Sequence, residues 1–242
     1  MARALIRNIV AGTPGRAMLR RCRASVRRAR DRLMQRHIPL ELLRSEFGFG
    51  FGALYHPFVS AAREPDEARA AAYLVDYYHA MNAVLDTFSD PMERVPVQAW
   101  KLGREAIVAS LASLGCVPSN YTLPEHMIAE GARQQAGRLH TLLASIEEHG
   151  YRPLRHGAEP LGGPAVDGTV LLLRGQHRVA ALCALGFETV PVAVVGMSNV
   201  PRRLSSSRTE RLPLVLDGTM TATVAGRVLR RIASGQFDHI VP

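Results

Sequence analysis

Apolar and polar positions along the chain change their period most sharply near residue 174. Residues 170–173 form an apolar run that predicts a buried strand, and this run stops at Arg174-Gly175-Gln176. The Ala, Val and Leu residues that follow have the spacing of a short helix, which Gly186 closes. A second strand is predicted over residues 190–195, with Pro191 at a position where a missing N–H is tolerated. The pattern therefore predicts a strand, a tight turn, a helix and a second strand.

The helical spacing of apolar residues recurs before and after this segment. It predicts four further helices, over residues 64–88, 97–114, 124–148 and 221–234. Glycines follow the last three at the usual position of a helix C-terminus: Gly115, Gly150 and Gly235. The chain is thus expected to combine strands with helices, which indicates the α/β class.

The remaining stretches lack a clear helical or strand period. Residues 47–52 alternate Phe and Gly, and they are interpreted as an irregular loop that buries its aromatic rings for packing rather than for a ligand. Residues 150–168 are rich in Gly and Pro and predict a loop. Residues 196–207 predict an exposed, mobile connector, and residues 212–216 predict a short strand.

Length and composition limit the classes of protein to which the chain can belong. The chain has 242 residues, of which 47% are hydrophobic, enough for one core with a helical addition. No apolar run approaches the ~18 residues of a membrane span. Three cysteines, Cys22, Cys116 and Cys183, match neither a metal pattern nor a disulfide framework, which predicts a reducing, cytoplasmic location. The histidines other than His177 show no ligand spacing, so no protein-bound zinc is expected.

Positive charge is concentrated at the N-terminus. Of 30 basic and 21 acidic residues, residues 1–36 hold eleven arginines and one acid, Asp31, which leaves 19 basic and 20 acidic residues elsewhere. The high pI is therefore no sign that the globular part binds nucleic acid. An apolar stripe along residues 19–33 predicts a basic amphipathic helix. Three roles remain open for it: peripheral binding to an anionic membrane surface, binding to DNA, or packing on the protein itself.

The turn after residue 173 carries the candidate chemistry. A tight turn that leads into a helix presents free backbone N–H groups and the positive end of the helix dipole to an anion. The same turn holds His177 and Arg178, whose side chains are suited to phosphate oxygens. The alternative is a structural turn in which Arg178 pairs with a carboxylate such as Glu188. We favour a phosphate site, because the helix N-terminus attracts an anion in either case.

The order of helix, loop, strand, Gly-x-His-Arg turn, helix, Gly and strand with Pro resembles the ParB/sulfiredoxin superfamily. Residues 142–150, 174–178 and 187–192 carry this resemblance, which covers about residues 124–196, a third of the chain. The resemblance implies a nucleotide whose phosphates lie on the turn. The residues of this turn are Arg174, Gly175, Gln176, His177 and Arg178. The flanking regions resemble those of small bacterial members rather than those of chromosome-partitioning proteins.

The resemblance adds a helix to the predicted site, and one difference from the family argues against the sulfiredoxin reaction. In sulfiredoxins a helix spaced Lys-x-x-Ser-x-x-x-Thr-Ile contacts ATP, and the same spacing here holds Arg138, Thr141 and Ser145. A hydrogen bond back to their own helix is the alternative for the last two. Gln176 stands where sulfiredoxins have the reactive cysteine, so the chain lacks the thiolate that sulfinic-acid phosphoryl chemistry needs. Partitioning-type ParB proteins bind CTP at this turn, but too few residues follow for a helix-turn-helix and a dimerisation tail.

These patterns predict an α/β protein with a small mixed sheet and packed helices, preceded by a helical N-terminal region. The expected regions are residues 1–36, 37–120, 121–200 and 201–242, with the site in the third. The expected function is binding of ATP or CTP with Mg²⁺ on the phosphates, and phosphoryl transfer or nucleotide hydrolysis if the site is catalytic. A non-catalytic DNA-binding or regulatory module is the competing function, and a membrane-surface adaptor is a third.

Overall fold

The computed structural model describes residues 35–51, 56–114, 122–152, 160–197 and 200–235. The chain divides into two compact units, residues 1–35 and 36–242, and the described residues belong almost wholly to the second unit. The basic amphipathic helix predicted near the N-terminus lies outside the described residues. The regions predicted after residue 36 all lie within the second unit.

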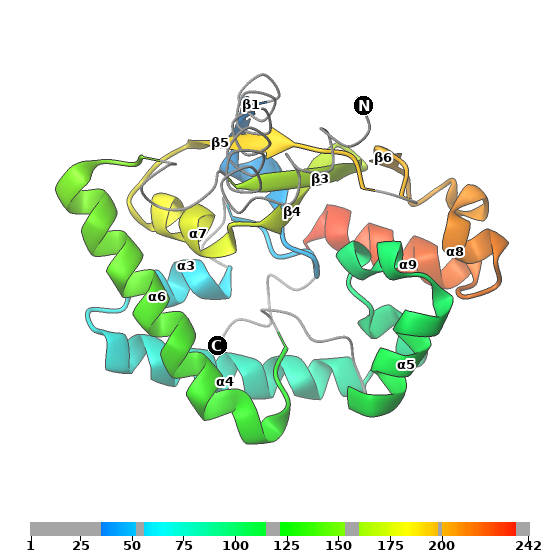
Figure 1. Ribbon diagram of the computed structural model, residues 1–242, viewed down its shortest axis with the longest axis horizontal. Helices are drawn as coiled ribbons and strands as arrows, with labels where there is room; N and C mark the ends of the chain where they lie inside the picture. Colours follow the sequence, from blue (N-terminus) through cyan, green and yellow to red (C-terminus); the bar gives the residue numbers. More distant parts are fainter. Residues whose placement is uncertain (1–34, 52–55, 115–121, 153–159, 198–199, 236–242) are drawn as a thin grey trace, which may run out of the picture. The chain divides into compact units, whose positions relative to one another are not determined.

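A mixed sheet of six strands organises the described residues. Its strands are β1 Gln35–Pro39, β2 Leu43–Arg44, β3 Leu161–Val166, β4 Thr169–Arg174, β5 Thr189–Val194 and β6 Arg203–Leu204. Their order is β1-β5-β3-β4-β2, and β6 also pairs with β3 (Figure 1). Strands β3 and β4 are antiparallel, whereas β3 runs parallel to β5 and β6, and β4 runs parallel to β2. The predicted α/β class with a small mixed sheet and packed helices is confirmed.

Helices cover both faces of the sheet and form two hydrophobic cores. Side chains alternate along β4, so Val170 and Leu172 pack in the first core and Leu171 and Leu173 in the second. The helices of the first core are α3 Pro57–Arg63, α4 Glu67–Asp86, α6 Ile128–His149 and α7 Gln176–Ala184. The second core is built from η2 Pro91–Arg94, η3 Val97–Leu102, α5 Arg104–Leu114, α8 Pro213–Leu216 and α9 Ala222–Ser234. In Figure 1 the green α6 belongs to the first group and the red α9 to the second.

The helices α4, α6 and α9 confirm three of the four predicted outside the central segment. Asp66 caps α4 by accepting a hydrogen bond from the N–H of Arg69, and Thr221 caps α9 in the same way. Gly235 follows α9 with a left-handed φ of 68°, as expected of a C-terminal glycine. Short 3₁₀ turns complete the chain: η1 Leu40–Leu42, η4 Glu125–Met127 and η5 Thr209–Arg211. Local signals therefore located these three helices correctly.

The loop predicted over residues 150–168 is wrong in its second half, because strand β3 occupies it. Asp167 and Gly168 turn the chain with φ values of 43° and 93°, the left-handed values of a two-residue hairpin turn. A Cβ at Gly163 would lie 2.8 Å from the side chain of Leu173, so this strand uses glycine for close packing against β4. The glycines that suggested a loop are therefore a packing feature of the sheet.

Three other local predictions also need correction. The helix predicted over residues 97–114 is split into η3 and α5 by Gly103, which has a φ of 80°. The strand predicted over residues 212–216 is the helix α8, because Pro213 takes the first helical position and an apolar run this short fits either element. The connector predicted over residues 196–207 contains β6, which pairs with β3.

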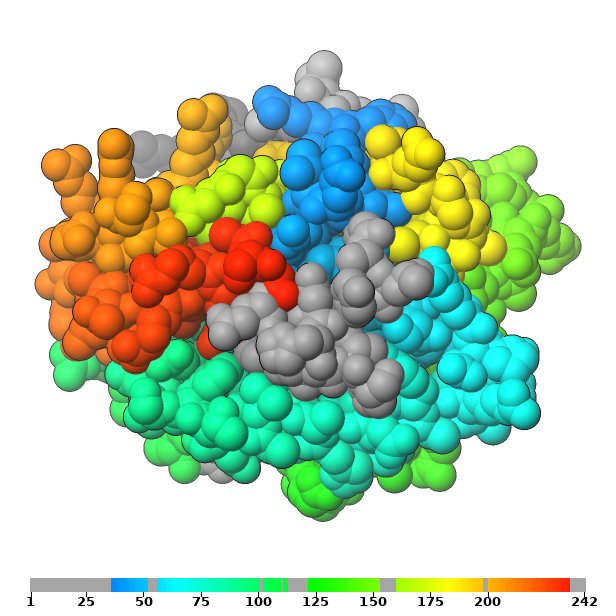
Figure 2. All heavy atoms as spheres, turned by 180° about the vertical axis from the view of Figure 1, so that it is seen from behind, coloured from blue at the N-terminus to red at the C-terminus, as the bar shows by residue number. Residues whose placement is uncertain are grey.

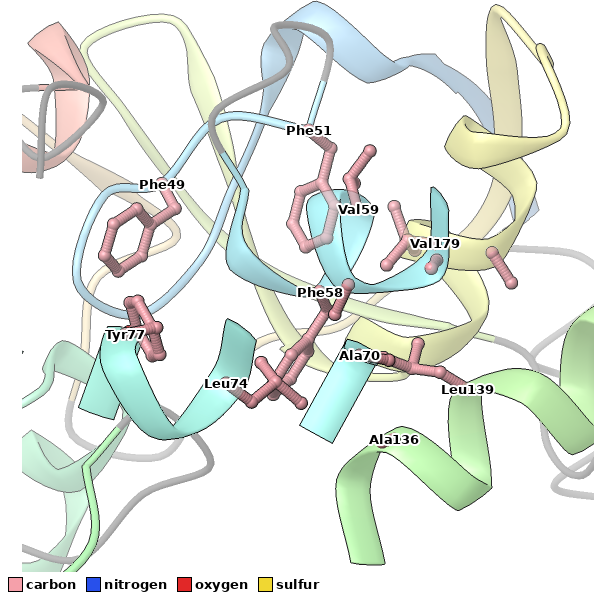
Figure 3. Close-up of a cluster of buried hydrophobic side chains, with 14 of the residues drawn as sticks. Phe49, Phe51, Phe58, Val59, Ala70, Leu74, Tyr77, Ala136, Leu139 and Val179 are labelled. Carbon is pink, nitrogen blue, oxygen red and sulfur yellow. The ribbon is translucent and has the colours of Figure 1, made fainter. Parts of the chain in front are cut away.

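The Phe-Gly stretch is an irregular loop that buries its aromatic rings, as predicted. Phe47, Phe49 and Phe51 are fully buried in the first core. The ring of Phe49 meets that of Tyr77 on α4 edge to face, with 5.8 Å between their centroids (Figure 3). The stretch therefore contributes three large side chains to the core that lies beneath α7.

The same stretch also touches the second core through its backbone. A Cβ at Gly48 would lie 2.9 Å from the backbone oxygen of Arg231 on α9, and Gly48 has a φ of 107°. Figure 2 shows residues 35–51, in blue, between the red α9 and the yellow segment that contains α7. Only a residue without a side chain permits this close approach.

We expect Gly48→Ala to destabilise the protein more than Gly103→Ala. Both glycines have positive φ, so each substitution stores backbone strain of about 1–3 kcal/mol. Only Gly48 faces backbone atoms at contact distance, and overpacking adds about 1–3 kcal/mol. Urea denaturation of the two variants and the wild type measures the difference. Equal free energies of unfolding for the two variants would contradict a tight contact between the Phe-Gly stretch and α9.

Candidate functional site

The first turn of α7 begins directly at the end of β4. Gly175 is the residue before the helix and has the left-handed conformation, with φ of 96° and ψ of 22°. A Cβ at this position would lie 3.0 Å from the Cα of Pro160, so both the backbone angle and the space favour glycine. Among the described residues, no side chain caps the first turn of this nine-residue helix. Its N-terminal N–H groups and the helix dipole are therefore available to attract an anion.

His177 lies in this first turn as a half-buried residue with a neutral imidazole. Its ring stacks on that of Phe58 from α3, with 4.6 Å between the centroids and 19° between the planes. Burial lowers the pKa of His177 to about 4, and the positive charges of Arg138 and Arg178 act in the same direction. The Nε2 atom is buried and has no hydrogen-bond partner within the described part of the chain. A neutral imidazole offers one hydrogen bond to a ligand without adding charge.

Arg178 is half-buried in the same turn, and its Nη1 atom is also buried without a hydrogen-bond partner among the described residues. Burial lowers the pKa of Arg178; Tyr151 opposes this shift, and the nearby Arg174 adds to it. No ion pair joins Arg178 to Glu188 or to another carboxylate of the described residues. One guanidinium nitrogen is thus without an acceptor among them.

Of the three α6 residues predicted to belong to the site, the structure places Arg138 near the turn. Helix α6 packs against α7 in the first core, and Arg138 lies close enough to His177 to lower its pKa. Arg138 itself is exposed, as is Thr141, while Ser145 is half-buried farther along the helix. The role of Thr141 and Ser145 stays a prediction. Arg138 is the member of this group that the electrostatics connect to the turn.

Positive charge gathers around the turn, and no carboxylate of the described residues forms an ion pair with it. Arg174 is exposed at the end of β4, and Arg138 and Arg178 flank His177. Among the described residues these three arginines take part in no ion pair. Gln176, at the first position of α7, is buried with 3% of its surface exposed. The arrangement concentrates positive charge at one helix N-terminus, while the amide of Gln176 supplies no nucleophile.

Two neighbours of the site, Phe58 and Tyr151, were missed by the sequence reasoning. His56 followed by Pro57 is a local signal for a helix start, so α3 itself was detectable. Its contact with α7 was not detectable, because nothing in the local pattern relates one helix to the other. The packing of α3 on α7, two segments that are distant in the sequence, therefore brings Phe58 to the site.

Several sequence predictions concern metals and membranes. Within the described residues no group of three or more His, Cys, Asp or Glu side chains is arranged to hold a metal ion. Among the helices that the structure describes, none combines the length and hydrophobicity needed to cross a membrane. Residues 1–36, for which DNA or membrane contacts are predicted, lie outside the described residues except for the last two positions.

Comparison of the chain with protein-family models, with curated proteins and with solved structures found no match.

We expect the stability of the folded protein to fall on acidification from about pH 6.5 to about pH 4, partly through His177. The unfolded chain protonates this histidine near 6.5, whereas its folded pKa is about 4, so the unfolded state binds more protons in this window. His56, whose pKa is lowered by burial and by His177, acts in the same direction. The contribution of His177 is at most about 1.4 kcal/mol per pH unit.

Urea denaturation at several pH values, for the wild type and His177→Gln, measures this contribution. The variant should show a shallower fall in unfolding free energy between pH 6.5 and 4. The exposed His126, replaced as His126→Gln, is the control and should retain the wild-type slope. Identical slopes for His177→Gln and the wild type would mean that His177 is not held neutral by the fold.

Proposed function

We propose that the first turn of α7 binds the phosphate groups of a nucleotide, ATP or CTP. The observation that supports this most directly is the pair of buried nitrogen atoms, His177 Nε2 and Arg178 Nη1, that lack partners within the described residues. Leaving a buried polar group without a hydrogen bond costs about 1–3 kcal/mol. Phosphate oxygens at the turn would accept hydrogen bonds from Arg178 Nη1 and from the N–H of His177 Nε2 and so remove this cost.

The charges around the turn favour a phosphate over a neutral ligand. A guanidinium presents a planar fork of N–H donors that matches two phosphate oxygens. Three such groups, on Arg138, Arg174 and Arg178, surround one uncapped helix N-terminus without a carboxylate in an ion pair with them in the described residues. An anion with several charges would therefore gain more here than a single carboxylate.

The placement of Arg138 favours a ligand longer than one phosphate. This arginine comes from α6, while Gly175 and Arg178 belong to the β4–α7 turn. A chain of two or three phosphates could contact both elements at once. The resemblance of the turn and of the α6 spacing to the ParB/sulfiredoxin superfamily points to the same class of ligand. It is also the reason for naming ATP and CTP as the two candidate nucleotides.

The chain's own residues would bind and orient the phosphates. The α7 N–H groups and Arg178 would hold one phosphate, Arg138 and Arg174 would balance the remaining charge, and His177 would add a hydrogen bond. Mg²⁺, if bound, would be held mainly by phosphate oxygens, because the described residues offer no cluster of protein ligands. Phosphoryl transfer or hydrolysis remains the proposed reaction class if the site is catalytic. Gln176 argues against sulfiredoxin chemistry, which needs a thiolate at that position.

Isothermal titration calorimetry with ATP, CTP and GTP, with and without Mg²⁺, tests the proposal. We expect binding of ATP or CTP and a loss of at least tenfold in affinity for Arg178→Ala, because a hydrogen bond to a charged group contributes about 1.5–3 kcal/mol. Arg138→Ala should weaken binding less, because its side chain is exposed and its charge is screened by solvent.

Arg133→Ala is the matched control for both variants. Arg133 lies on α6, as Arg138 does, but its guanidinium pairs with Glu130 at 2.7 Å. Its removal should leave the affinity unchanged. Absence of binding by the folded wild type to all three nucleotides would overturn the proposal, and an equal loss in Arg133→Ala would show that only general charge attraction is at work.

A further inference from the structure

A column of four aromatic rings leads from the Phe-Gly stretch to the candidate site. The ring of Phe51 stacks on that of His56, with 3.8 Å between the centroids and 22° between the planes. His56 is followed by Phe58 at 5.6 Å, and Phe58 by His177 at 4.6 Å. Phe51 and Phe58 are visible within the same core in Figure 3. Two segments that are far apart in the sequence, residues 51–58 and the first turn of α7, therefore meet in one column of rings.

The start of α3 determines where Phe58 lies. His56 is fully buried, and its Nδ1 atom accepts a hydrogen bond of 3.2 Å from the backbone N–H of Phe58. Pro57 occupies the first position of the helix, where its fixed φ suits the turn. The imidazole of His56 is thus both the cap of α3 and the second ring of the column. Its position fixes the backbone from which Phe58 reaches α7.

The ring of Phe58 covers one face of the His177 imidazole. With 19° between their planes, the two rings lie almost parallel, so any rotation of the imidazole about its Cβ–Cγ bond that tilts its plane would lose this stacking, whereas a half-turn would keep it. The charged or titratable groups that act on His177 come from three sides: Arg138 from α6, Arg178 from α7 and His56 from the start of α3. None of them carries negative charge.

We propose that Phe58 is a positioning residue of the site, whose ring fixes the plane of the His177 imidazole in which Nε2 can donate a hydrogen bond to a bound phosphate. The ligand in this statement rests on the proposed function; the orientation of the imidazole does not. Phe58 acts through His177 and touches no ligand itself. Residues of the predicted region 37–120 would then help to determine how tightly a site in the predicted region 121–200 binds.

The experiment removes the ring while retaining apolar volume. In Phe58→Leu the stacking of two flat rings is lost. The imidazole of His177 can then rotate and becomes more accessible to water. Burial is the largest cause of the low pKa of His177, and its titration midpoint should rise by at least one pH unit. Long-range ¹H–¹⁵N correlation NMR of the full chain follows this midpoint and the tautomer, with His177→Gln identifying the signal. The affinity for ATP or CTP should fall about three- to tenfold although every charge is retained.

Phe47→Leu is the matched control, because Phe47 is equally buried in the same core. It should lower the melting temperature as Phe58→Leu does and leave the His177 midpoint and the affinity unchanged. Phe58→Met serves as the second variant if Phe58→Leu does not give a native amide spectrum. An unchanged His177 midpoint in a folded Phe58 variant would overturn the proposal, as would an equal shift in Phe47→Leu. If the wild type binds no nucleotide, the proposed function fails, while the His177 midpoint still decides whether Phe58 positions the ring.

Discussion

Strand β4 is buried on both faces, and the positions of the other elements follow from this constraint. Val170 and Leu172 pack beneath α7 and its neighbours, while Leu171 and Leu173 pack against the core that contains α9. A strand in this situation has little freedom to shift, because a one-residue slip would exchange its two faces. Its last residue is Arg174, so the turn that follows starts from a well-defined point. The position of β4 therefore determines where the candidate site begins.

The site combines an attractive electrostatic field with hydrogen bonds that the described residues leave unmet. The helix N-terminus and three arginines supply positive charge, and the half-buried imidazole of His177 stays neutral between them. A protonated histidine here would add to the repulsion among the arginines, which the low pKa avoids. A bound polyanion would instead balance these charges. This is the physical basis of the proposed nucleotide function.

The Phe-Gly stretch and α3 connect the two cores with the site. Gly48 lets the stretch approach the backbone of α9, while its aromatic rings and His56 lead to Phe58 beneath α7. A segment that had no recognisable period in the sequence therefore carries packing contacts of both cores. Its effect on the candidate site operates through the orientation of one imidazole ring.

The sequence by itself determined the features that depend on neighbouring residues. Apolar runs located β4 and β5, helical spacing and glycines such as Gly235 located helices, and the Gly175 turn identified the candidate site. Only the tertiary structure decided the features that depend on contacts between distant segments. Glycines in β3 resembled a loop until its packing on β4 explained them, and the stacking of Phe58 on His177 had no local signal. The physical reason is that periodicity, caps and turns are short-range properties of the backbone, whereas close approach and burial depend on what the folded chain places opposite each residue.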